Sequence, residues 1–104
     1  MISDQLLGRI KSALADAFGE RLEGVVLYGS EARGEAGPDS DIDLLVLLMP
    51  PVDRRTDRWT AIQALYPLVL ELGRPIHARP VDIRDYRAAK VPLYREAKKE
   101  GVPA

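Results

Sequence analysis

The feature that most constrains the fold is an almost uninterrupted apolar run, "LLVLL" at residues 44–48. Five consecutive aliphatic residues cannot form a strand that alternates between core and water, so this strand is expected to be covered on both faces. Pro50 and Pro51 end it, because proline cannot donate to a strand ladder. The run therefore predicts an α/β or α+β domain with this strand at the centre of a small mixed sheet.

The other periodicities predict helices that pack on that sheet. The expected elements are a helix capped by Ser3 or Asp4 and ending at Gly19, a strand "GVVLYG", a long helix from about Asp53 to Gly73, an edge strand "RPIHARPVDI" and a final helix "VPLYREAKKEG". Trp59 and Tyr66 are seven residues apart, on one face of the long helix, which favours packing against a core or a partner over base stacking.

Length and charge narrow the class of protein. A chain of 104 residues suits a single domain spanning residues 1–104. The net charge of −1 provides no general attraction for nucleic acid, so RNA is not the expected partner. The absence of cysteine excludes disulfides and thiolate metal sites. Without an apolar run of about 18 residues or a signal-peptide core, we expect no membrane contact and a cytoplasmic location.

Two carboxylates lie directly before the apolar run, at the start of the predicted strand. Asp41 and Asp43 are two residues apart and should point to the same face, about 6.6–6.8 Å from each other along the backbone. Two anions at that spacing repel each other unless one is protonated or a cation neutralises both. Mg²⁺ is held by one or two carboxylates together with substrate phosphates, so the pair predicts half of a magnesium–nucleotide site.

The other half is expected at the end of the preceding strand, at Gly29 and Ser30. Glycine lets the backbone approach a ligand, and amide groups at the start of a helical turn bind anions. The Ser30 hydroxyl adds a donor, and Arg33 in the same turn is either a phosphate ligand or a surface charge.

Gly29-Ser30, ten further residues and Asp41-Ile42-Asp43 resemble the G-S-x10-D-x-D signature of the DNA polymerase β-like nucleotidyltransferases. The run "LYGSEARGEAGPDSDIDLLV" is most similar to the minimal nucleotidyltransferase (MNT) group, many of which are antitoxins of HEPN-type RNases. The resemblance implies the polymerase-β-like fold and transfer of a nucleoside monophosphate, usually AMP from ATP, to a hydroxyl.

The family resemblance further implies that Ser30 holds the β- and γ-phosphates and that Asp41 and Asp43 hold two Mg²⁺ ions. The acceptor is then expected on a partner protein, which the resemblance suggests is of the HEPN type; the alternative partner is a second copy of the chain.

The family's third carboxylate has no obvious counterpart. The matching position on the edge strand is His77, which shares its face with Arg79, whereas Asp82 has the opposite parity and qualifies only if a bulge resets the alternation. Two interpretations stay open. Either the protein is a reduced nucleotidyltransferase with His77 as proton acceptor or phosphate contact, or it is a non-catalytic module that binds nucleotide or a partner.

Overall fold

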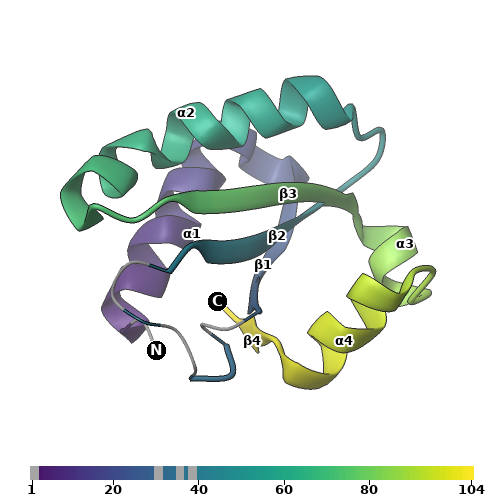
Figure 1. Ribbon diagram of the computed structural model, residues 1–104. Helices are drawn as coiled ribbons and strands as arrows, with labels where there is room; N and C mark the ends of the chain where they lie inside the picture. The colour runs from purple at the N-terminus through teal and green to yellow at the C-terminus, as the bar shows by residue number, and fades with distance from the viewer. Residues whose placement is uncertain (1–2, 30–31, 35–36, 38–39) are drawn as a thin grey trace.

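The computed structural model describes residues 3–29, 32–34, 37 and 40–104 (Figure 1). The elements in chain order are α1 (Asp4–Phe18), the 3-10 helix η1 (Gly19–Arg21), β1 (Leu22–Tyr28), β2 (Ile42–Leu48), α2 (Arg54–Leu72), β3 (Ile76–Asp82), α3 (Ile83–Arg87), α4 (Pro92–Glu100) and β4 (Val102–Pro103). The predicted start of the first helix is confirmed, because the Ser3 hydroxyl accepts a hydrogen bond from the amide of Leu6 at 3.1 Å.

The four strands form one mixed sheet in the order β3-β2-β1-β4. β2 runs antiparallel to β1 and parallel to β3, so the apolar strand is central, as its sequence predicts. β4 is an element that the sequence did not reveal. It has only two residues and pairs with Val26 and Leu27 of β1, a length too short for any periodicity to show.

Helices cover the two faces of the sheet unequally (Figure 1). α1 and α2 pack on one face, where Leu44 and Val46 of β2 join the larger core. On the other face, Leu45 and Leu47 pack with residues of α3 and α4. The fold class is therefore confirmed: a mixed α/β sheet with its central strand buried on both sides. None of the helices in the described part of the chain has the length and apolarity needed to span a bilayer.

A half-buried ion pair stabilises the start of α2. Arg21 donates two hydrogen bonds of 2.9 Å to the carboxylate of Asp57, which also accepts one from the amide of Asp53 at 3.0 Å. Asp57 is only 5% exposed. The hydrogen bonds from Arg21 lower the pKa of Asp57, against the opposing effect of its burial. The pair holds the N-terminal turn of α2, from which the arginines discussed below project.

Candidate active site

Strand register brings three functional side chains into one row. Tyr28 of β1 is opposite Asp43 of β2, and Asp43 is opposite His77 of β3. Paired residues of neighbouring strands point to the same face, so the three side chains lie side by side on the face that carries α3 and α4. Tyr28 packs against the apolar cluster that those helices form with the sheet, whereas Asp43 is half-buried and His77 remains exposed.

Asp41 completes the cluster from the residue before β2. Its Oδ2 lies 2.8 Å from Nε2 of His77. A carboxylate oxygen accepts hydrogen bonds, so Nε2 of His77 is assigned as the donor. Both side chains are about half exposed, at 49% for Asp41 and 54% for His77, so the bond orients the imidazole more than it stabilises the fold.

Gly29 lacks a side chain at a point where the Asp43 carboxylate comes close to the backbone. The glycine also has an unusual backbone conformation. Its φ of +75° lies in the left-handed region, where glycine is favoured. A Cβ at this position would lie 2.8 Å from Oδ2 of Asp43, closer than van der Waals contact allows. The amide of Arg33 donates a hydrogen bond to the Gly29 carbonyl at 3.2 Å. Ser30 lies outside the described residues, so the phosphate contact expected of its hydroxyl stays a prediction.

The electrostatics of the site disfavour a second negative charge. Burial raises the pKa of Asp43, and the nearby charge of Asp41 raises it further, while His77 and Arg79 oppose the shift. A bound cation would relieve this repulsion. The donor set fits Mg²⁺, which takes oxygen ligands and commonly completes its shell with phosphates and water. Within residues 3–29, 32–34, 37 and 40–104, no group of three or more histidine, aspartate or glutamate side chains is arranged to hold a metal, so a bound nucleotide would have to supply further ligands.

Asp82 is not the third carboxylate. β2 and β3 stay in continuous parallel register from Ile42 opposite Ile76 to Leu48 opposite Asp82, so no bulge resets the alternation. Asp82 lies at the far end of β3, where it caps α3 and binds the guanidinium of Arg84 at 2.8 Å. His77 occupies the place beside Asp43 that the third acid would take.

Arg33 lies in an exposed ion pair, and the phosphate contact expected of it stays a prediction. Its guanidinium lies 3.6 Å from the carboxylate of Glu100 at the end of α4, and both side chains are exposed. Neither charge has to be desolvated, so the pair adds little to stability and can separate when a ligand arrives.

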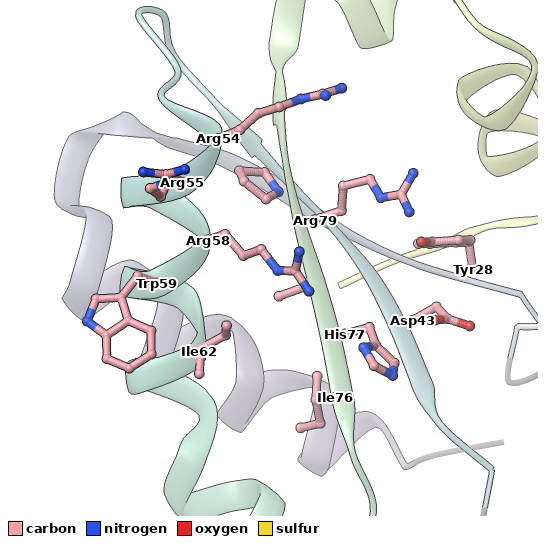
Figure 2. Close-up of a pocket in the computed structure, with 12 residues that line it drawn as sticks. Tyr28, Asp43, Arg54, Arg55, Arg58, Trp59, Ile62, Ile76, His77 and Arg79 are labelled. Carbon is pink, nitrogen blue, oxygen red and sulfur yellow. The ribbon is translucent and has the colours of Figure 1, made fainter.

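A groove of about 1060 Å³ opens beside the row and passes around the free edge of β3 (Figure 2). Its lining includes residues from both faces of β3, among them Ile76 and His77. α2 forms the other wall with Arg54, Arg55 and Arg58, and Figure 2 shows Arg58 extending from α2 toward β3. The sequence reasoning missed these arginines as site residues. The visible signal was the spacing of three cations in the first turns of a helix, "RRTDR".

Comparison with known proteins agrees with this geometry. A model of the nucleotidyltransferase domain family matches residues 7–102. A Methanocaldococcus jannaschii protein, designated a candidate protein adenylyltransferase, is 40% identical over 70 residues, which are 67% of this chain and 43% of that protein. The chain thus spans less than half the length of this curated relative.

Solved structures share the fold. A toxin–antitoxin complex with AMP-PNP superimposes with a TM-score of 0.67 at 24% identity over 92% of this chain and 69% of the other. The complex of a tri-AMPylated Shewanella oneidensis HEPN toxin with its MNT antitoxin gives a TM-score of 0.60 at 23% identity, over 95% and 70%. Spectinomycin adenyltransferase of Enterococcus faecialis, solved with ATP and spectinomycin, gives 0.62 at 21% identity, over 81% and 36%.

Proposed function

The chain belongs to the nucleotidyltransferase domain family, and on this premise we propose that it transfers AMP from ATP to a hydroxyl group of a partner protein. The observation that supports this most directly is that Asp41 and Asp43 both lie beside His77 on one face, with Gly29 leaving space for the Asp43 carboxylate. An exposed strand start would not require a glycine at that point of close approach.

In this proposal Asp41 and Asp43 hold Mg²⁺, which when bound neutralises phosphate charge and polarises the α-phosphate. The amides after Gly29 and the Ser30 hydroxyl hold the terminal phosphates. Arg79 follows His77 by two residues in β3 and therefore adds positive charge on the same face.

In this proposal His77 is the proton acceptor. The hydroxyl oxygen of the acceptor forms a bond to the α-phosphorus, the bond from that phosphorus to the departing pyrophosphate breaks, and the hydroxyl proton passes to Nδ1 of His77. The bond between Nε2 and Asp41 orients the ring and stabilises the imidazolium that forms. Asp41 thus contributes one oxygen to His77 and keeps the other for the cation.

A second function has one observation in its favour. The imidazole of His77 stands where the family's third carboxylate is expected, which weakens metal binding and is compatible with a non-catalytic module that binds nucleotide or a partner. Family members in solved toxin–antitoxin complexes have the same fold. We extend that to this chain as a proposal: it acts on, or binds, a HEPN-type toxin.

The test uses ATP labelled at the α-phosphate, Mg²⁺ and a HEPN-type toxin as the acceptor. Wild-type protein is expected to label the acceptor, and Asp41→Asn combined with Asp43→Asn is expected to abolish labelling. Calorimetric titration with ATP and Mg²⁺, read together with the labelling, separates the two functions, because the transferase binds nucleotide and labels the acceptor whereas the non-catalytic module does not label it. Label transfer that survives the double substitution would refute the metal mechanism.

A further inference from the structure

One face of α2 is apolar and uncovered. Of the large hydrophobic residues that are exposed in the described part of the chain, four lie on this helix: Trp59 at 59%, Ile62 at 39%, Tyr66 at 55% and Leu70 at 65% exposure. Their spacing of three, four and four residues aligns them along one side of the helix, over about 16 Å. We call these four residues the α2 stripe. Its opposite side, with Ala61, Leu65 and Leu68, is buried in the core.

Trp59 and Tyr66 were expected to pack against a core or a partner, and their exposure excludes the first alternative. They do not pack in the core of this chain. A contiguous apolar strip on an otherwise polar helix surface is typical of a protein interface, whereas isolated exposed apolar residues are not. Within the described residues nothing covers the α2 stripe, so this surface is available to a partner.

Positive charge marks the end of the stripe nearest the active site. Arg54, Arg55 and Arg58 are exposed, and none of the three has an ion-pair partner within the described residues. All three line the groove that continues around the edge of β3 to His77 and Asp43. A surface that fits here must bring apolar side chains for the stripe and carboxylates for the arginines.

A second copy of the chain does not offer those carboxylates on α2. The acids of this helix are Asp57, which is buried against Arg21, and Glu71, which binds Arg9 through contacts of 3.1 and 2.6 Å. RNA would satisfy the arginines but would leave Ile62, Tyr66 and Leu70 in water, because base stacking on Trp59 covers only one end of the stripe. An acidic protein segment satisfies both parts.

We propose that the α2 stripe and Arg54, Arg55 and Arg58 form a docking surface for an acidic amphipathic helix of a partner protein. The partner's apolar residues cover the stripe, and its carboxylates meet the three arginines. The groove around β3 then leads from the docked helix to the row that contains Asp43 and His77. That the docked partner also carries the acceptor hydroxyl rests on the proposed function, whereas docking itself does not.

The sole tryptophan of the sequence makes docking observable, because Trp59 lies on the stripe. A phage library of random 16-residue peptides without tryptophan is panned against the full chain. The enriched peptides are expected to be acidic, with apolar residues three and four apart. Synthetic versions are expected to shift Trp59 emission to shorter wavelength, and versions with lysine in place of the acids are not.

Two variants divide the surface into its charged and apolar parts. Arg54→Glu with Arg55→Glu and Arg58→Glu is expected to weaken binding of the enriched peptide by about 10-fold or more, with the fold intact because acids suit a helix N-terminus. Tyr66→Ser with Leu70→Ser is expected to weaken it by about 10- to 100-fold.

Matched controls change exposed side chains of the same kind elsewhere on the surface. Arg87→Glu with Arg95→Glu and Lys99→Glu controls for charge, and Met49→Ser with Val91→Ser controls for apolar exposure. Both are expected to leave peptide binding within about 2-fold of wild type.

Several outcomes overturn the proposal: enriched peptides that are neutral or basic, equal binding by the charge-reversed variant, dimerisation that depends on Tyr66 and Leu70, or a single-stranded 12-nucleotide RNA that binds more tightly than the acidic peptide. Calorimetry with ATP and Mg²⁺ on the same samples keeps the two proposals apart. Nucleotide binding without peptide binding refutes only the docking surface, and peptide binding without nucleotide binding refutes only the proposed transfer.

Discussion

Replacing Gly29 by alanine tests the site geometry without removing an ionisable group. Two effects are expected. Alanine at a φ of +75° costs about 1 kcal/mol of folding free energy, because the left-handed region is unfavourable for residues with a Cβ. The new Cβ would also lie 2.8 Å from Oδ2 of Asp43, so the carboxylate must retreat by about 0.6 Å to reach the ordinary contact distance of 3.4 Å. The end of a side chain can yield at little further cost in stability.

Catalysis is more sensitive to that retreat than folding is. Misplacement of a reacting group by about 1 Å costs on the order of 100-fold in rate, so we expect Gly29→Ala to reduce label transfer by roughly that factor. The melting temperature should fall by only about 4–8 °C. Transfer of α-labelled AMP and thermal unfolding by circular dichroism measure the two effects.

Gly73→Ala is the matched control. Gly73 follows α2 with a φ of +67°, and a Cβ there would meet nothing within 4 Å. The Gly73→Ala variant should therefore lose about the same folding free energy, because alanine is equally unfavourable in the left-handed region, and it should keep its activity. If Gly29→Ala transfers label within about 3-fold of Gly73→Ala, the close packing of Gly29 against Asp43 has no bearing on the site, and the reasoning is refuted.

Three further predictions follow from single contacts. Asp57→Asn should destabilise the fold by about 1.5–3 kcal/mol at pH 7, measured by urea unfolding. Because Arg21 lowers the folded-state pKa of Asp57, the difference from wild type should be full above about pH 4 and shrink as pH falls through the folded pKa; a difference independent of pH would contradict this. His77→Asp should tighten Mg²⁺ binding in the presence of ATP by on the order of 10-fold in calorimetry, since it adds a third carboxylate, and unchanged affinity would show that residue 77 does not face the cation. Gly101→Ala should cost about 1–3 kcal/mol in thermal unfolding, because its Cβ would overlap a backbone carbonyl of α4 and lie 2.6 Å from Val26; a stability equal to wild type would mean that the α4–β4 junction relaxes freely.

Local pattern was enough for much of the fold. The apolar run of β2 required cover on both faces, and period-2 alternation placed Asp41 and Asp43 on one side and Ala78 on the core side. Helix caps such as Ser3 were also readable, because a cap depends on residues three positions apart. Each of these features depends on neighbours in the chain, and so the sequence alone determined them.

The composition of the site depended on contacts between distant residues. Only the parallel pairing of β2 with β3 puts His77 beside Asp43 and within 2.8 Å of Asp41, and only the continuous register sends Asp82 to the opposite end as a helix cap. The exposure of Trp59 is a similar case. An apolar residue on a helix face has the same local signature whether it packs in a core or remains exposed, and the packing of α2 through its other side leaves Trp59 exposed.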